Sequence, residues 1–305
     1  MNVYEIVAKR GDTPAVALGF FDGFHIGHKK LFEVLDANAS GRKKVVFTFK
    51  NHPDNLLGFN TKYILTNEER LEFFRNYGID DVYFIEFNKK IMQMDKDRFI
   101  EEILIDKLNV SVVVVGYDFT FGYMAEGNSK YLCEKLHQFG RECIVIDPVM
   151  YQKHIVSSTL IRRLILEGNI KLANYMLGFN FFINGTVKRG NRLGKKMGFP
   201  TINIKFDKEK IVPRKGVYIT NTIIDDKRYL SITNVGTNPT VSASENIKIE
   251  THILGIDKNM YGKRVKIEFI DFVREEKKFS NIDELKNQIA QDVEYVKTLF
   301  CKASI

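Results

Sequence analysis

The segment with the most obvious chemical use lies between positions 19 and 28, Gly-Phe-Phe-Asp-Gly-Phe-His-Ile-Gly-His. His25 and His28 are three residues apart, so they would share one face of a helix. Glycine removes the side chain that keeps a nucleotide away from the backbone, and the amides at a helix N-terminus attract anions. We therefore predict a nucleotide-phosphate site in this segment. Its other predicted contacts are Gly19, Phe20, Asp22, Gly23 and Gly27.

A histidine pair at this spacing could also be half of a metal site. Such a site needs a third ligand at a suitable spacing, and the sequence offers none. A His-x-x-His pattern alone is a weak indication of a metal. The neighbouring glycines and the apolar run before them favour phosphate binding.

Three consecutive hydroxyl side chains, Ser157, Ser158 and Thr159, precede a predicted helix, and Arg162 follows one turn later. Hydroxyls and a guanidinium at a helix N-terminus can hold an anion. Serine and threonine at this place are also ordinary N-caps, which need no ligand. Taken together with the histidine segment, the cluster is predicted to bind phosphate.

Buried strands that alternate with helices must position these groups. Near-continuous apolar runs predict strands at 15–19, 45–49, 82–85, 112–115 and 144–146. Helical patterns are predicted near 28–39, 66–77, 96–108 and 128–139. This alternation is typical of an α/β domain with a parallel sheet, which binds ligands at the carboxyl ends of its strands. The histidine segment and the Gly-Tyr-Asp-Phe-Thr-Phe-Gly segment at 116–122 both follow such strands.

The sequence pattern changes after Gly178. A helical pair is predicted from Ser157 or Ser158 up to this glycine. Beyond it, short alternating strands separated by Gly, Asn and Pro run from about 181 to 271, which is typical of an antiparallel barrel. We place a domain boundary near 178–183. The predicted domains are residues 1–180 and 181–305.

The last segment of the chain is predicted to be a helix. Asn281 and Glu284 have the spacing of a capping box. One apolar stripe follows the helical period. It consists of Ile282, Leu285, Ile289, Val293 and Val296.

A basic segment rich in glycine opens the second domain. Residues 181–216 carry ten Lys or Arg and two acidic residues, an excess equal to the net charge of +8 of the whole chain. Glycines among basic residues suit a loop that closes over phosphates, although a hairpin turn is the commoner reason for them. The residues of this loop are Gly190, Gly194, Lys195 and Gly198.

Two metal ligands and a base are predicted in the strands that follow. Thr201 and Asn203 are two apart, hence on one face of an extended strand. Their oxygens are hard ligands of the kind that Mg²⁺ takes beside phosphate oxygens. Glu250 interrupts an apolar strand. Pointing inward beside the metal, it could accept a proton from an attacking alcohol, whereas pointing outward it would be surface charge.

The motifs together resemble a known family. GFFDGFHIGH, GYDFTFG and SSTLIR resemble the FMN adenylyltransferase module of prokaryotic bifunctional riboflavin kinase/FAD synthetases. GFPTIN, GVY, NVGTNPT, the Glu250 strand and FVREEKKF resemble riboflavin kinase motifs over about residues 181–300. The resemblance covers almost the entire chain. It implies a Rossmann-like nucleotidyltransferase domain followed by a β-barrel riboflavin kinase domain with a terminal helix.

The resemblance implies two consecutive reactions. Riboflavin and ATP give FMN, and the FMN phosphate then attacks the α-phosphorus of ATP to give FAD and pyrophosphate. His25 and His28 are assigned to the ATP phosphates and the transition state. Arg162 with Ser158 and Thr159 would hold the departing pyrophosphate.

The same resemblance assigns roles in the kinase reaction. Thr201 and Asn203 would bind Mg-ATP, and Glu250 would be the general base on the ribityl 5′-hydroxyl. Arg274 would help to hold the flavin or to order the segment that closes the site. Further binding residues in the two domains are His52, Asp118, Phe119, Ser157, Pro200 and Asn234.

Three positions depart from the family pattern. Asn51 stands where the family usually has proline, Thr120 where arginine is frequent, and Lys195 where arginine is common. Lysine keeps the charge but not the bidentate geometry of arginine. The departures at Asn51 and Lys195 motivate an alternative function, in which the protein keeps one activity and uses the other domain as a flavin or nucleotide sensor.

The composition is that of an ordinary globular protein, 44% hydrophobic and 28% charged. No apolar run approaches the roughly 20 residues that span a bilayer, and no signal-peptide core is present. Cys133, Cys143 and Cys301 form an odd set without metal-type spacing, which predicts reduced thiols in a cytoplasmic enzyme.

The expected partners are the small molecules ATP, riboflavin and FMN, with no membrane and no nucleic acid. The protein is expected to be a monomer or a weak homo-oligomer. Nucleic-acid binding through the basic segment is the alternative from another class. It is disfavoured because the sequence has no recognisable nucleic-acid motif and no aromatic residues interleaved for stacking.

Overall fold

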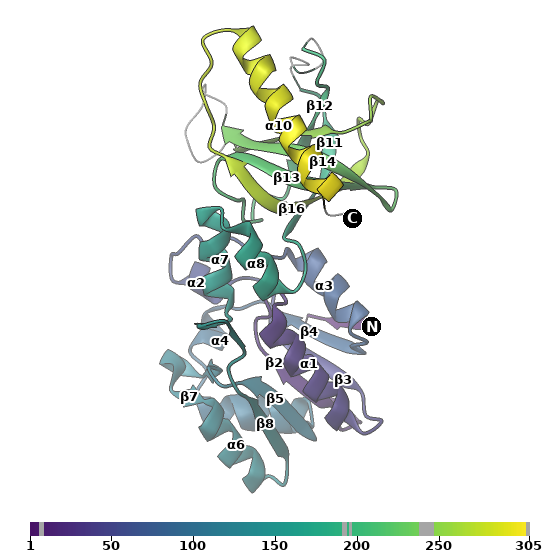
Figure 1. The fold of residues 1–305 in the computed structure, drawn as a ribbon. Helices are drawn as coiled ribbons and strands as arrows, with labels where there is room; N and C mark the ends of the chain where they lie inside the picture. Colours follow the sequence, from purple (N-terminus) through teal and green to yellow (C-terminus); the bar gives the residue numbers. More distant parts are fainter. Residues whose placement is uncertain (6–8, 191–193, 195–196, 238–246, 303–305) are drawn as a thin grey trace. The chain divides into compact units, whose positions relative to one another are not determined.

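The first part of the chain is built around a six-stranded parallel sheet in the order β1-β4-β3-β2-β5-β8 (Figure 1). Its strands are β1 Asn2–Tyr4, β2 Ala15–Leu18, β3 Lys44–Phe49, β4 Asp81–Ile85, β5 Val112–Gly116 and β8 Glu142–Ile146. All neighbouring pairs are parallel, which confirms the prediction. The sequence does not predict β1, because its residues are exposed. This computed structural model describes the chain except residues 6–8, 191–193, 195–196, 238–246 and 303–305.

Helices connect these strands. The helices α1 Ile26–Ala39, α3 Asn67–Asn76 and α6 Ser129–Gln138 confirm three predicted ones. The fourth, predicted at 96–108, is a short helix α5 Lys96–Arg98 that continues as the π-helix η1 Phe99–Lys107. The remaining elements are α2 Pro53–Leu56, α4 Lys89–Met92, η2 Tyr123–Ala125, β6 Thr120–Phe121 paired with β7 Gly127–Asn128, and β9 Met150–Tyr151 paired with β10 His154–Ile155.

The second part forms a closed antiparallel barrel in the order β11-β12-β15-β14-β13-β16 (Figure 1). Its strands are β11 Phe182–Lys188, β12 Thr201–Phe206, β13 Gly216–Ile224, β14 Lys227–Thr237, β15 Ile247–Ile253 and β16 Arg264–Arg274. This architecture confirms the predicted barrel. Two helices precede it, α7 Ser158–Glu167 and α8 Ile170–Leu177. The second ends at Gly178 in a left-handed conformation, φ 70°, as its sequence signal predicted.

Hydroxyl side chains occupy one face of three neighbouring barrel strands. Thr220 Oγ1 lies 2.8 Å from both Ser231 Oγ and Thr233 Oγ1. Thr233 Oγ1 lies 2.9 Å from Thr251 Oγ1, and all four residues are fully buried. Because side chains alternate along a strand, their neighbours in sequence face the other way. That other face packs against the C-terminal helix through Val217, Ile219 and Ile232.

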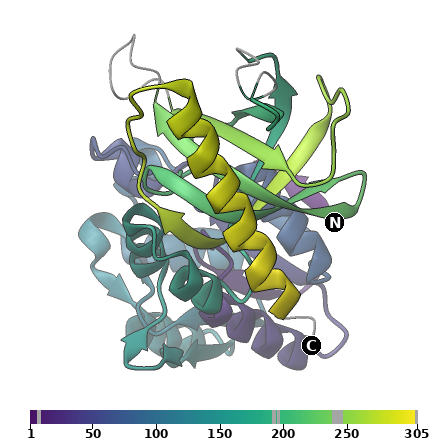
Figure 2. The ribbon, with the colours of Figure 1, turned by 45° about the horizontal axis from the view of Figure 1, so that its top comes forward.

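The C-terminal helix α10, Ile282–Lys302, lies along the outside of the barrel (Figures 1 and 2). Asn281 Oδ1 accepts a hydrogen bond from the Glu284 amide at 2.8 Å, as the capping pattern predicted. Val293 and Val296 are buried against the barrel. Ile282, in contrast, is 59% exposed, so the predicted stripe is wrong at the first turn of the helix.

The chain divides into two units, Met1–Ser158 and Thr159–Ile305. The helices α7 and α8 belong to the second unit, where α8 packs on β16. The domain boundary near 178–183 stays a prediction from the change in sequence pattern. Among the described residues, none of the helices combines the length and the apolar character that crossing a membrane requires.

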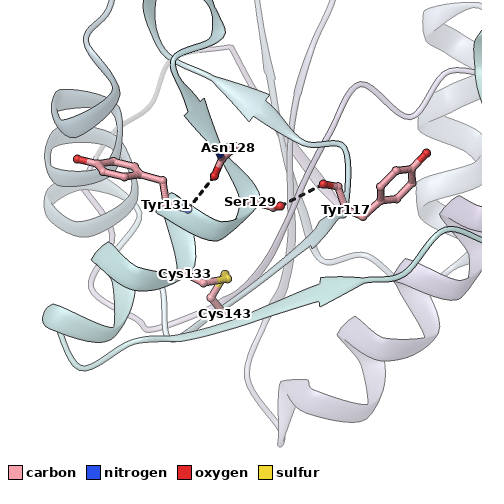
Figure 3. Close-up of a disulfide and its surroundings, with 6 residues drawn as sticks. All are labelled: Tyr117, Asn128, Ser129, Tyr131, Cys133 and Cys143. Atoms are coloured by element: carbon pink, nitrogen blue, oxygen red, sulfur yellow. Dashed lines mark hydrogen bonds between the residues drawn. A yellow bond between two sulfur atoms is a disulfide. The ribbon is translucent and has the colours of Figure 1, made fainter.

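A disulfide joins Cys133 on α6 to Cys143 on β8 (Figure 3). The expectation of reduced thiols is therefore wrong for these two residues. The packing of α6 beside β8 brings their Cα atoms to 5.0 Å, within the usual range for a disulfide. Spacing in the sequence could not reveal this, because it depends on how a helix packs on a strand. The side chain of Cys301 lies outside the described residues.

Candidate active sites

The turn after β2 holds an unusual run of backbone conformations. Phe21, Gly23 and Phe24 all have positive φ angles, of 56°, 82° and 42°. Such angles are strained for phenylalanine, and strain of this kind concentrates at functional sites. Phe21 and Phe24 are buried, and both rings contact Phe32 on α1 at centroid distances of 5.1 and 4.9 Å. Aromatic packing therefore holds the turn in its strained form.

The two histidines lie side by side at the start of α1. Their rings are stacked, with centroids 3.6 Å apart and an angle of 16° between the planes. His25 is the N-cap rather than part of the helix, and its Nδ1 accepts a hydrogen bond from the His28 amide at 3.3 Å. The predicted convergence of the imidazoles is therefore present, through capping geometry instead of a shared helix face.

Both imidazoles are neutral at neutral pH. Burial lowers the pKa of His25 from 6.5 to about 4. The pKa of His28 is well below its usual value because of burial, followed by the nearby charges of His25 and Arg70. The buried Nδ1 of His28 has no hydrogen-bond partner within the described residues. A neutral imidazole can donate or accept a hydrogen bond at a phosphate, but it brings no positive charge.

Polar side chains of the same turn hold the surrounding backbone. The carboxylate of Asp22 accepts hydrogen bonds from the amides of Ile64 and Leu65 at 3.0 and 2.9 Å. The hydroxyl of Ser158 donates to the Asp22 carbonyl at 2.6 Å. Of the predicted hydroxyl cluster, Ser158 is thereby joined to the histidine segment at Asp22. Gly23 permits this, since its φ of 82° suits glycine and a side chain there would crowd Ile64.

Two other predicted segments lie at the carboxyl ends of β3 and β5, the strands on either side of β2. His52 caps α2 after β3, and its ring packs edge-on against Phe20 at a centroid distance of 4.7 Å. After β5, Asp118 is exposed, whereas Phe119 stacks on Phe121 at 5.7 Å and packs against the core. Thr159 and Arg162 lie on α7 in the second unit, and their approach to the histidines stays a prediction.

The barrel places three predicted residues in one row. Asn203 on β12 is paired with Glu250 on β15, which is paired with Asn234 on β14. Directly paired residues point to the same face of a sheet. Asn234 is two residues from Ile232, so the row lies on the face that packs against α10, away from the buried hydroxyls. Glu250 therefore does not enter the hydroxyl-lined interior, and its carboxylate pairs with Lys248 Nζ at 2.6 Å.

The environment of Asn203 fits a cation. The residue is 4% exposed, and its Oδ1 has no hydrogen-bond partner within the described residues. An unpartnered buried oxygen is costly unless a ligand satisfies it. Gly190 lies directly over this amide, where a side chain would collide with Asn203. Thr201, two residues before, lies on the same strand face and is exposed.

The remaining predicted residues of the second unit contact neighbouring segments or belong to the glycine-rich loop. The carbonyl of Pro200 lies 2.8 Å from His252 Nδ1, and Asn234 Nδ2 donates to Glu276 at 3.2 Å. Arg274 makes a bidentate ion pair with Asp292 of α10 at 3.0 and 2.7 Å. Gly194 and Gly198 are described, the latter with φ 87°, whereas Lys195 lies outside the described residues.

Sequence reasoning missed two charged residues beside these sites. Lys248 could have been found from the two-residue period of a strand, which places it on the same face as Glu250. Arg70 gave no such signal. It lies on the amphipathic helix α3, where an arginine usually faces solvent, yet it is fully buried.

Comparisons with known proteins match the two parts of the chain to two different families. Family models match FAD synthetase over residues 8–160 and riboflavin kinase over residues 177–300. The bifunctional riboflavin kinase/FMN adenylyltransferase of Buchnera aphidicola subsp. Schizaphis graminum is 34% identical over 301 residues, 96% of each chain. The protein of the same name from Bacillus subtilis is 31% identical over 297 residues, 95% of this chain and 93% of its own.

A solved structure shares the whole fold. A Streptococcus pneumoniae protein described as a macrolide-efflux protein aligns with a TM-score of 0.89 and 29% identity, over 97% of this chain and 99% of its own. The fold and sites thus define a nucleotidyltransferase domain joined to a kinase barrel. With the two family models and the full-length relatives, the chain belongs to the bifunctional riboflavin kinase/FMN adenylyltransferases.

Proposed function

We propose that residues 1–180 transfer an adenylyl group from ATP to FMN and that residues 181–305 phosphorylate riboflavin. The observation that carries the proposal is the match of two different family models to the two parts of the chain that hold separate polar sites. The first part of the chain holds the stacked imidazoles beside the turn after β2, whose backbone is strained at Phe21 and Phe24. The second holds the Asn203–Glu250–Asn234 row on a barrel.

In the adenylyl-transfer reaction, an oxygen of the FMN phosphate forms a bond with the α-phosphorus of ATP. The bond from that phosphorus to the departing pyrophosphate breaks in the same displacement, without a covalent protein intermediate. His25 and His28 donate hydrogen bonds to the phosphate oxygens from their neutral rings, in a mostly buried place where such bonds are strong. Arg162, Ser158 and Thr159 are proposed to hold the pyrophosphate.

In the kinase reaction, the ribityl 5′-hydroxyl attacks the γ-phosphorus of ATP, and ADP leaves. Glu250 accepts the proton of that hydroxyl, while the ion pair with Lys248 orients the carboxylate. The side chain of Asn234 donates a hydrogen bond to Glu276, which lies in the segment after β16. This bond links that segment to the site. Arg274 is proposed to order this segment by anchoring it to α10, because its guanidinium is engaged by Asp292.

Thr201 and Asn203 are proposed to hold Mg²⁺ together with phosphate oxygens of ATP. The unpartnered Oδ1 of Asn203 supports this assignment. No group of three or more His, Cys, Asp or Glu suited to a metal occurs in the described part of the chain, which fits an ion held partly by the nucleotide. When bound, the ion would neutralise charge on the phosphates.

We propose a cytoplasmic enzyme that acts on small molecules as a monomer or weak homo-oligomer. Light scattering over a range of protein concentrations measures the oligomeric state directly. A stable large assembly at low concentration would contradict this part of the proposal.

A flavin product assay tests the function. The purified protein is incubated with ATP, Mg²⁺ and either riboflavin or FMN, and the flavins are separated by chromatography. We expect FMN and FAD from riboflavin, and FAD from FMN. Absence of both products in a folded preparation refutes the proposal. Conversion of FMN with inert riboflavin would show instead that the barrel has no kinase activity and that only adenylyl transfer is retained.

A further inference from the structure

A fully buried arginine packs against the turn after β2, which forms part of the proposed adenylyl-transfer site. Arg70 on α3 is 0% exposed. Its Nη2 donates to Thr48 Oγ1 at 3.2 Å and to the Phe49 carbonyl at 2.7 Å, both at the carboxyl end of β3. Its Nε and Nη1 are buried without a hydrogen-bond partner within the described residues. Burying a charge is costly, and an apolar side chain is often at least as stable in its place.

The contacts of Arg70 lead directly to predicted site residues. Its guanidinium carbon lies 4.5 Å from the ring centroid of Phe20, and that ring packs against His52. Thr48, which accepts a hydrogen bond from Arg70, donates one to the Phe20 carbonyl at 3.1 Å. Arg70 therefore fixes both the backbone and the side chain of Phe20, at the point where the chain leaves β2 for the glycine turn.

The charge of Arg70 also reaches the site. Its field lowers the pKa of His28, and the nearby Asp22 charge in turn favours the charged form of Arg70. Burial lowers the pKa of Arg70 to about 10, so the guanidinium stays positive at physiological pH. The stacked imidazoles, in contrast, are neutral there. A phosphate bound at this turn would thus accept hydrogen bonds from the histidines and be attracted by the positive charge of the Arg70 guanidinium.

We propose that Arg70 is a positioning residue of the adenylyl-transfer site: its buried guanidinium fixes Phe20 and supplies permanent positive charge beneath the turn that receives nucleotide phosphates. The residue does not touch the substrate. It acts through Phe20 and through its field, which a low-dielectric interior screens weakly. The inference rests on the proposed location of the phosphate site.

The test compares three variants of the full-length enzyme. R70M removes the charge and keeps an unbranched side chain, whereas R70K keeps the charge without the planar fork. R75M changes an exposed arginine on the same helix and is the matched control. Steady-state kinetics of FAD formation give kcat and the KM values for FMN and ATP. The riboflavin kinase activity of each variant is an internal control, since the barrel forms the other unit.

We expect R70M to lower kcat/KM for FAD formation by about tenfold to a hundredfold, the range seen when site groups are slightly misplaced. Its KM for at least one nucleotide should rise. R70K should recover most of the KM and keep a reduced kcat, because charge is restored without the stacking on Phe20. R75M and the kinase activity of all variants should stay within about twofold of the parent.

Three results would overturn the inference. The first is that R70M forms FAD with a kcat/KM within twofold of the parent. The second is that the KM values of R70K are as high as those of R70M. The third is that R75M loses as much kcat/KM for FAD formation as R70M does. If R70M unfolds by circular dichroism, R70K alone decides, through its retained KM and lowered kcat. An H28A variant with unchanged FAD formation would instead refute the proposed location of the phosphate site.

Discussion

The low pKa of His25 makes the stability of the protein depend on pH in a way that one substitution can isolate. In an unfolded chain this imidazole takes up a proton near pH 6.5, but in the folded protein burial delays protonation to about pH 4. The unfolded state therefore binds more protons between these values. The contribution to stability is fully present above about pH 6.5 and is lost as the pH falls toward 4.

The size of the effect follows from the same two values. At about 1.4 kcal/mol for each pH unit, the loss from pH 6.5 to pH 4 is about 3 kcal/mol for His25. His25 is 6% exposed, so solvent screening removes little of it. His28 shifts in the same direction and adds to the slope.

Urea unfolding followed by circular dichroism at pH 7, 6, 5 and 4.5 measures this dependence. The matched variant is H25N, because asparagine keeps an N-cap acceptor for the His28 amide but does not titrate. We expect the unfolding free energy of the parent to fall more steeply with decreasing pH than that of H25N. The difference between the two slopes should reach at most the value for one bound proton, about 1.4 kcal/mol per pH unit. Equal slopes, or an NMR titration that gives His25 a pKa near 6.5, would refute the reasoning.

Three further predictions concern the two reactions and the anchor of the C-terminal helix. E250Q keeps the shape of the base but cannot accept the proton, so riboflavin phosphorylation should fall by about two to four decades while FMN adenylylation persists. H28A should do the reverse, and equal damage to both activities by either variant would contradict separate active sites. D292A leaves Arg274 of a mostly buried ion pair without its partner, so the barrel should lose about 2–4 kcal/mol of unfolding free energy in urea titrations, and an unchanged midpoint would argue against the anchor.

The fold could be predicted because its signals are local and periodic. The valine run of β5 and the apolar run of β2 are continuous because parallel strands are buried on both faces. The alternation in β12 to β15, and the stop of α8 at Gly178, follow likewise from neighbouring residues. The short strand β1 and the π form of the helix predicted at 96–108 carry no distinct local signal, so they were found only in the structure.

The sequence by itself determined which residue types gather in each motif, and hence the family and the pair of reactions. The tertiary structure decided the features that depend on packing, strand pairing and burial. These are the Cys133–Cys143 disulfide, the sheet face on which Glu250 lies, and the neutral state of His25 and His28. It also decided the burial of Arg70, which helix periodicity does not predict. The physical reason is that motifs record short-range chemistry, whereas desolvation and contact depend on elements that are distant in the chain.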